Sequence, residues 1–462
     1  MFKRQDKGKR LKKLSLIVLF VMVIISLTWV FLTKLEGEKP VIELNLQSGV
    51  VPANFEITGT VDDEKSGIKK IWISLLQNGK DTVLLDEQYR SQGLLQKGTI
   101  IRTPIQLNVN AKKMGLSDGP AKLRIAVWDY SWRDWWNGNQ TYMEKEIRFD
   151  TKPPVVSILT SQHNVARGGS GLVIYKLSEQ CTQSGVFVGD DFFPGYSGYY
   201  NDKNIHLAFF AIPVDYDKKI DIFIKAIDPA GNHSRSGFYY YIRNKKFITD
   251  TINISENFLN WKLPEFQSVD GFPADKSSED QFIFINSQLR EKNNHAILEN
   301  GQKTDNRIFW KDAFGRLPNS ARKANFADQR VYKYNGNIIG KAVHMGVDLA
   351  SVKHAEIPAA NRGKVVFAGP VGIYGNLVCI DHGCGLMSIY AHLSRMVVNI
   401  NDLVEKGDII GYTGTSGLAG GDHLHFGMFI DHVFVNPVEW WDLSWINNNI
   451  TNKLETVQSM VQ

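Results

Sequence analysis

An uncharged apolar run near the N-terminus constrains this chain more than any other feature. Residues 14–32 are interrupted only by Ser15, Ser26 and Thr28. As a helix rising 1.5 Å per residue, this run would extend about 28 Å, close to the hydrocarbon core of a bilayer at about 30 Å. We therefore predict one transmembrane helix over residues 14–32, followed by several folded domains.

The charge around this run predicts its orientation. Residues 1–13 contain seven Lys or Arg and one Asp, so the rest of the chain, whose total net charge is +5, carries −1. A basic tip predicts a cytoplasmic N-terminus, with everything beyond residue 33 outside the cytoplasm. A cleaved signal peptide is the alternative, but residues 29–34 offer no A-x-A-like cleavage site. The nearly neutral remainder argues against nucleic-acid binding, which needs a basic folded surface.

Two stretches of about 100 residues share a pattern typical of β-sandwiches. In residues 38–150 and 152–245, short runs alternate apolar and polar side chains between turn residues. A late run in each copy, 123–128 and 220–227, precedes a polar turn. The second turn, Asp-Pro-Ala-Gly-Asn, resembles that of bacterial immunoglobulin-like modules. The resemblance implies spacers or binding arms, with surfaces for wall-synthesis or hydrolase partners.

Four tryptophans crowd the end of the first stretch: Trp128, Trp132, Trp135 and Trp136. Exposed indoles can stack on sugar rings. Trp is highly buried on average, however, so we expect these side chains to pack the end of the first sandwich. We assign no site to them.

Residues 246–327 show weaker periodicity. Apolar residues near helical spacing predict one helix within 280–298, surrounded by loop. The segment is interpreted as a linker, and one hypothesis is that it folds over the neighbouring site and restrains it. Residues 443–462 form a polar tail, either a short helix or disordered.

Histidine is concentrated near the C-terminus, where seven of the eleven lie beyond residue 343. Imidazoles at that density usually bind metal or transfer protons. On an extended strand, His344 and Asp348 project to one face, as do His423 and His425. Two imidazoles and one carboxylate suit Zn²⁺ with an open fourth position. The candidate site therefore contains His344, Asp348 and one of the pair, with His392 as a further imidazole.

In order and surroundings, these residues closely resemble the lysostaphin-like zinc peptidases of the M23 family, which cut the peptide part of peptidoglycan. The resemblance covers residues 328–442. It rests on the H-x-x-x-D element at His344 and on the segments 374–383, 390–393, 404–414, 423–426 and 435–437.

Carried over by position, the resemblance implies that His344, Asp348 and His425 hold zinc and that His392 and His423 are the catalytic pair. It implies an antiparallel β-sheet endopeptidase that hydrolyses peptidoglycan cross-links or stem peptides during wall remodelling. Zinc would lower the pKa of its water, while imidazoles deprotonate that water and stabilise the oxyanion. The chain has no H-E-x-x-H motif to supply a glutamate base.

The remaining polar residues of this region are given supporting roles. The histidines at turn-like positions are interpreted as structural: His354, His382 and His432. Asn376 either supports the site or stabilises a turn. Asp422 and Gly427 depart from the family pattern, which leaves the specificity for one peptide bond open.

The three cysteines, Cys181, Cys379 and Cys384, lie in the exported part of the predicted protein. Cys379 and Cys384 flank a predicted tight connection and could form a disulfide there. Three buried thiols are the alternative.

The sequence thus predicts a mainly β, single-pass protein of the cell (inner) membrane, with its catalytic domain in the periplasm or cell wall. Two other functions stay open. One is a non-catalytic M23-type activator or scaffold for another wall hydrolase, although such proteins have typically lost metal ligands that this chain keeps. The other is an adhesion protein that acts through its sandwiches.

Overall fold

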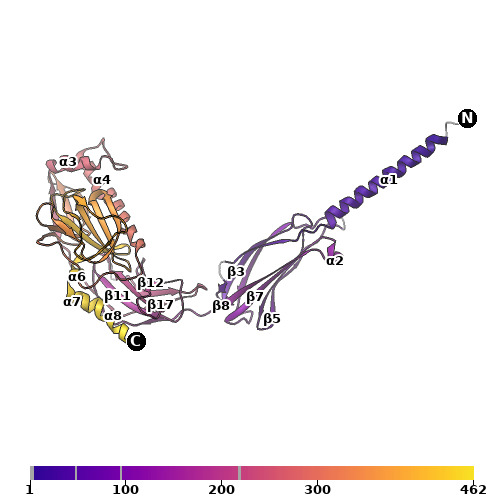
Figure 1. The fold of residues 1–462 in the computed structure, drawn as a ribbon, viewed down its shortest axis with the longest axis horizontal. Coiled ribbons are helices and arrows are strands. Elements are labelled where there is room, and N and C mark those ends of the chain that lie inside the picture. The colour runs from indigo at the N-terminus through magenta and orange to yellow at the C-terminus, as the bar shows by residue number, and fades with distance from the viewer. Residues whose placement is uncertain (1–4, 47–48, 94–95, 217–219, 462) are drawn as a thin grey trace. The chain divides into compact units, whose positions relative to one another are not determined.

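The computed structural model describes residues 5–46, 49–93, 96–216 and 220–461 (Figure 1). The other residues belong to the predicted basic tip (1–4), the first sandwich (47–48, 94–95), the second sandwich (217–219) and the tail (462), and lie outside the described residues. The chain divides into a first unit, Met1–Pro153 with Pro229–Asn232, and a second unit, Pro154–Asp228 with His233–Gln462. Strands dominate both units, which confirms the predicted mainly β fold class.

One long helix, α1 (Gln5–Lys34), opens the first unit. Its segment Lys9–Lys34 is long and apolar enough to cross a membrane, and it contains the predicted span. The last residue of the helix, Lys34, is only 3% exposed, because its side chain packs into the folded part of the first unit.

Two sheets of the first unit enclose one core. Alternate side chains of its central strand β4, such as Ile71, Ile73 and Leu75, are buried and share a cluster with Ile57 and Val61 of β3. The sheets contain, in spatial order, β1 (Val41–Asn45), β3 (Asn54–Asp62) and β6 (Arg102–Asn110), and β2 (Val50–Val51), β8 (Gln140–Phe149), β7 (Gly119–Asp129), β4 (Ile68–Gln77) and β5 (Lys80–Gln88).

The tryptophans at the end of β7 do not all pack inside. Trp128 and Trp132 are partly buried. Trp135 is 91% exposed and Trp136 54%, in the short helical turn α2 (Arg133–Trp136). The prediction that these side chains fill the end of the sandwich is therefore wrong for Trp135 and Trp136.

Two four-stranded antiparallel sheets begin the second unit. Their order is β14 (Tyr196–Ser197), β15 (Ile205–Ala211), β11 (Ser170–Leu177) and β9 (Val156–Ile158), and β13 (Asp191–Pro194), β12 (Gln183–Val188), β16 (Ile222–Ile227) and β17 (His233–Gly237). A parallel pair, β10 (His163–Ala166) and β18 (Tyr240–Arg243), accompanies them. The immunoglobulin-like character of both sandwiches stays a prediction.

The segment predicted as a linker is well structured. Its first strand, β19 (Thr249–Ile254), pairs in parallel with β21 (Gln329–Tyr334), which pairs with β22 (Asn337–Val343). The helices that follow β19 are α3 (Glu256–Lys262), η1 (Leu263–Phe266), α4 (Ser278–Phe284), η2 (Ile285–Leu289), α5 (Arg290–Leu298) and η3 (Glu299–Lys303). The helix predicted within 280–298 is confirmed, but the rest of the segment is more regular than expected.

A large antiparallel sheet carries most of the candidate residues. Every residue of its central strands β27 and β31 is buried, which is typical of strands covered on both faces. The spatial order is β20 (Ala321–Ala324), β23 (Val347–Ala350), β31 (Leu424–Ile430), β27 (Leu386–Leu393), β26 (Gly375–Asp381), β25 (Gly363–Val371) and β29 (Leu403–Val404), with β32 (Val433–Val435) on β31. A smaller sheet holds β24 (Glu356–Pro358), β30 (Ile409–Tyr412) and β28 (Arg395–Met396), and η4 (Gly372–Tyr374) precedes β26.

The C-terminal tail is helical and packs against the second unit. After α6 (Pro437–Trp441), which ends the predicted peptidase domain, the tail forms α7 (Leu443–Ile446), η5 (Asn447–Thr451) and α8 (Asn452–Val461). Lys453 Nζ donates to Leu172 O at 2.9 Å, and Tyr200 donates to Leu454 O at 3.1 Å. The segments that the sequence separates at residues 246, 328 and 443 thus share one compact unit, and those boundaries stay predictions.

Cys181, Cys379 and Cys384 are all free. Cys379 and Cys384 are fully buried, and Cys384 Sγ contacts Asn306 O at 3.3 Å. Cys379 and Cys384 therefore do not form the disulfide that the sequence allows.

Candidate active site

Neighbouring strands bring the candidate residues together. Asp348 on β23 lies directly opposite His425 on β31, and His425 lies opposite Ala391, next to His392 at the end of β27. His344 follows β22, and a bend rather than a continuous strand separates it from β23. The site is thus assembled by strand register, as the spacing of two between His423 and His425 predicts.

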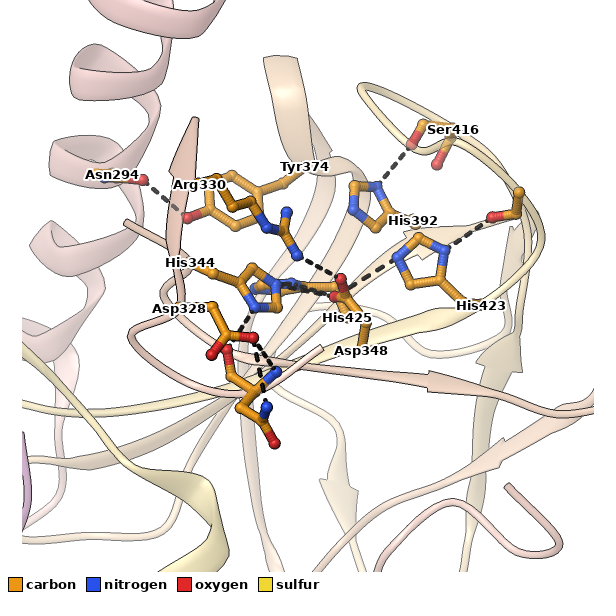
Figure 2. A network of polar contacts seen from close by, with 12 residues as sticks. Asn294, Asp328, Arg330, His344, Asp348, Tyr374, His392, Ser416, His423 and His425 are labelled. Carbon is orange, nitrogen blue, oxygen red and sulfur yellow. Dashed lines mark hydrogen bonds and ion pairs between the residues drawn. The ribbon is translucent and has the colours of Figure 1, made fainter. Parts of the chain in front are cut away.

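Three atoms converge at its centre (Figure 2). His344 Nε2 lies 3.0 Å from Asp348 Oδ1 and 3.0 Å from His425 Nδ1, and the last two atoms are 2.9 Å apart. Atoms bound to one Zn²⁺ at about 2.0–2.2 Å are at most about 4.4 Å apart. The separations therefore fit a shared metal ion.

The hydrogen bonds around the cluster also fit a cation. His344 Nδ1 lies 2.8 Å from Asn325 O, and since a carbonyl oxygen only accepts, Nδ1 carries the hydrogen and Nε2 presents a lone pair. That lone pair faces a carboxylate oxygen and a second imidazole nitrogen. His425 Nε2 is buried without a partner among the described residues. A cation at the centre would bind the lone pairs of both imidazole nitrogens and of the carboxylate oxygen without an extra proton on either ring.

Asp348 is held in its charged form. Burial by itself would raise its pKa, but the imidazoles that face it, first His344 and then His423 and His425, hold the pKa well below its usual value. On the other side, Arg330 Nη2 donates to Asp348 Oδ2 at 2.8 Å. Asp348 therefore presents one oxygen to the cluster and one to Arg330.

His392 and His423 flank the cluster with their ring centroids 4.9 Å apart. His392 Nδ1 donates to Ser416 O at 2.8 Å, and His423 Nδ1 donates to Gly421 O at 2.7 Å. Each ring thereby has its Nδ1 occupied, and His423 Nε2 lies 3.5 Å from Asp348 Oδ1. The backbone of His392 has φ +63°, a left-handed conformation that costs a non-glycine residue of order 1–3 kcal/mol and clusters at functional sites.

The two imidazoles differ electrostatically. Burial lowers the pKa of His392 well below its usual value, and the neighbouring His423 and His425 act in the same direction. Burial also opposes the charged form of His423, but its contacts with Asp348 raise its pKa overall. The surroundings therefore shift His392 towards the neutral form and His423 towards the protonated form.

These residues open into a cavity of about 600 Å³. One wall comes from the segment 246–327, including Phe258, Trp261 and Arg290, and another contains Tyr332 and Tyr374. Tyr374 donates its hydroxyl to Asn294 Oδ1 on α5 at 2.8 Å. Sequence reasoning assigned no site role to Arg330, Tyr332 or the residues of the segment 246–327, because they reach the site through the pairing of β19 with β21, which no local pattern reveals.

The three other histidines of the region have partners away from the cluster. His382 is buried between Arg362 O and Ser388 Oγ, each at 2.8 Å, and His432 Nε2 lies 3.0 Å from Asp191 Oδ1. His354 Nδ1 lies 3.1 Å from Ser394 Oγ. These contacts agree with structural roles.

Two residues singled out in the sequence stabilise loops beside the site. Asp422 accepts from the Thr413 hydroxyl at 2.6 Å. Asn376 Nδ2 donates to Leu393 O, and the Asn376 N–H donates to Ser416 Oγ, both at 2.9 Å. Asn376 thus connects the end of β27 to the loop that contains Ser416, the residue that accepts the hydrogen bond of His392.

Two imidazoles and a carboxylate that converge beside two further histidines on a β-sheet domain are an arrangement typical of metal-dependent hydrolases. Residues 342–437 match the peptidase family M23, so this part of the chain is an M23 peptidase domain.

Three relatives show the range of proteins that share this domain. The DD-carboxypeptidase/endopeptidase Mpg of Neisseria meningitidis is 38% identical over 21% of this chain and 22% of its own length. The peptidoglycan DD-endopeptidase ShyC of Vibrio cholerae is 32% identical over 28% of this chain and 29% of its own length. The murein hydrolase activator EnvC of Escherichia coli is 28% identical over 24% of this chain and 26% of its own length. The chain thus matches less than a third of the length of each of these relatives.

Proposed function

We propose that this protein is a membrane-anchored zinc endopeptidase that hydrolyses peptide bonds in peptidoglycan cross-links or stem peptides. The observation that carries the proposal is the convergence of His344 Nε2, Asp348 Oδ1 and His425 Nδ1 within 3.0 Å in a cavity that also holds His392 and His423. The M23 domain supports peptidase activity, and the relatives named as DD-endopeptidases support a peptidoglycan substrate.

The chain's own residues would divide the chemistry as follows. His344, Asp348 and His425 would hold zinc, which when bound polarises a carbonyl and activates a water. His392 Nε2 faces the cavity with Nδ1 already donating to Ser416 O, so it is set to accept a proton from water. His423, whose pKa is raised, is the better donor to the developing oxyanion or leaving amine.

Further proposals concern location. Helix α1 would cross the inner membrane once with the basic tip in the cytoplasm and the peptidase domain outside it. The two sandwich regions would then set the reach of the peptidase domain and offer surfaces for wall-synthesis or hydrolase partners.

The relative named as a hydrolase activator favours a second candidate function, non-catalytic activation of another wall hydrolase. All three candidate ligands and both flanking histidines are present in this chain, and an activator has no need of them. The enzyme is therefore the better-supported proposal.

The test is mass spectrometry of soluble products released from purified peptidoglycan by the full chain in detergent. We expect new peptide ends with zinc, and their loss with chelator or in His392→Ala. Their position identifies the peptide bond. If the zinc-loaded chain releases nothing by itself but accelerates a second wall hydrolase, the result would overturn the proposal of an enzyme and support the proposal of an activator.

A further inference from the structure

The turn α2 (Arg133–Trp136), which carries two exposed tryptophans, lies beside the outer end of helix α1 (Figure 1). Trp135 is 91% exposed and Trp136 54%, both in the turn α2. The residues just before them are bonded to the end of α1: Trp132 N–H donates to Lys34 O at 2.6 Å, and Arg133 Nε donates to Leu35 O at 2.9 Å. Large apolar side chains are thus displayed where the predicted span leaves the bilayer.

The end of α1 and this turn are parts of one packed structure. Lys34 is 3% exposed and donates to Gln96 O at 2.6 Å. Glu36 is 7% exposed, and its Oε1 accepts from Ser66 Oγ at 2.7 Å. The helix therefore enters the folded unit directly, and the position of α1 in a membrane fixes the position of Trp135 and Trp136.

The turn exposes both indoles through an unusual backbone, with the Trp136 ring also packed against Trp132 at a centroid distance of 4.5 Å. Asp134, Trp135 and Trp136 have φ values of +48°, +52° and +73°, three successive non-glycine residues in the left-handed region. The turn is held by Gly138 N–H donating to Arg133 O at 3.1 Å and by Lys69 Nζ donating to Trp136 O at 2.9 Å. Such backbone strain persists where the surroundings enforce it, and it points to a role for the exposed residues.

The depth of the turn follows from the helix. The apolar run ends at Leu32, and Lys34, whose carbonyl binds Trp132, comes two residues later, about 3 Å further along the axis. The polar layer on each side of the hydrocarbon core is roughly 5–8 Å thick. The turn therefore lies at headgroup depth, which is where Trp is enriched in membrane proteins.

We propose that Trp135 and Trp136 form an interfacial membrane contact, inserting into the headgroup layer of the bilayer that α1 spans and fixing the first unit on its surface. The inference rests on the anchor of the proposed function. Two rigid indoles beside the span restrict the tilt of the unit, which a single helix cannot do. The alternative occupant, a glycan strand of the wall, would leave these indoles accessible to water in a bare membrane.

The test uses the full chain in liposomes and the quenching of tryptophan fluorescence by lipids brominated near the headgroup or near the chain end. Subtracting the fluorescence of the double variant Trp135→Phe/Trp136→Phe from that of the native chain gives the fluorescence of these two indoles. In that double variant, Lys80→Trp supplies a matched control, because Lys80 is exposed at the start of β5, opposite Gln77 at the far end of β4 and roughly 30 Å from the anchor end. The same subtraction between the native chain and Trp29→Phe gives the quenching of Trp29, which lies inside the span.

We expect headgroup-brominated lipid to quench Trp135 and Trp136 strongly, and to leave the indole introduced at position 80 unaffected. Quenching of Trp29 without quenching of Trp135 and Trp136 would overturn the inference and leave the anchor intact. A fluorescence change of these two indoles only on adding glycan fragments would replace the lipid with sugar as the occupant. No quenching of Trp29 would overturn the anchor, and the inference with it.

Discussion

Lys262 and Glu265 form an ion pair 2.7 Å long that holds the loop of residues 415–417 at both ends. Lys262 Nζ donates to Thr415 O, and Glu265 Oε2 accepts from Gly417 N–H at 2.9 Å. The residue between them, Ser416, accepts the hydrogen bond of His392 Nδ1. The segment before the peptidase domain thereby fixes the orientation of a candidate catalytic imidazole, and Lys262 is only 1% exposed.

Loss of this ion pair should reduce turnover. In Lys262→Met the loop loses one of its two backbone anchors, so the His392 ring becomes less well oriented. Since general base catalysis contributes about 10²–10⁴-fold, we expect kcat to fall about tenfold while KM changes little. The measurement is steady-state kinetics on a defined stem peptide.

Arg307→Gln is the matched control, because it removes an exposed ion pair with Asp305 and should leave kcat unchanged. Unchanged kcat in a folded Lys262→Met would contradict the positioning role. A rise in kcat would instead support the hypothesis that the segment 246–327 restrains the site.

Metal removal should destabilise the second unit. The candidate ligand atoms of His344, Asp348 and His425 lie about 3 Å from one another only in the folded second unit, so a bound metal ion would stabilise the folded state. A ligand present at 100 times its Kd adds about 2.7 kcal/mol to the free energy of unfolding, so chelator should lower Tm and zinc should restore it. Calorimetry should find this zinc-dependent shift in His354→Ala and not in His425→Ala. A shift of equal size in both variants would place the metal elsewhere.

Acid should destabilise the protein through His382. Burial lowers the pKa of His382 to about 4, below its unfolded value of about 6.5. The neutral ring therefore contributes stability that is fully present above pH 6.5 and is lost as the pH falls towards 4, about 3 kcal/mol in all. Denaturant titrations at pH 7 and pH 5 should show a smaller loss for His382→Gln than for the native chain. Equal losses would rule His382 out as the cause.

Glu439 should act in the opposite direction. Burial raises its pKa to about 7, above its ordinary value of 4.5, while Oε2 accepts from Ser170 N–H at 3.0 Å. The stability it contributes is full below pH 4.5 and is lost as the pH rises through 7. We expect Glu439→Gln to raise the free energy of unfolding at pH 8 by up to about 3 kcal/mol and to change little at pH 4. Equal effects at both pH values would contradict this assignment.

The sequence predicts those parts of the site that depend on local spacing. His423 and His425 are two residues apart in extended backbone, which places both rings on one side as predicted. His344 and Asp348 also meet, but through the bend before β23 rather than through a continuous strand. The side of the cavity that carries Trp261, Arg290 and the Lys262 ion pair could not be predicted this way. It depends on β19 pairing with β21 across a long intervening segment, and such non-local pairing leaves no periodic signal.

Average tendencies fail where the backbone overrides them. Trp is usually buried, which predicts burial for Trp135, yet its left-handed turn displays the ring. The sequence predicts that the polar tail is either a short helix or disordered. Its last helix, α8, is ordered because Leu454 and Val457 are buried in the apolar core of the second unit.

The most direct test of the account measures zinc content and peptidoglycan digestion on the same preparations of the full chain, His392→Ala and His425→Ala. We predict zinc and released peptides for the native chain, zinc without products for His392→Ala, and neither for His425→Ala. A His425→Ala protein that keeps its zinc and still releases peptides would contradict the assignment of His344, Asp348 and His425 as the metal centre of a peptidase.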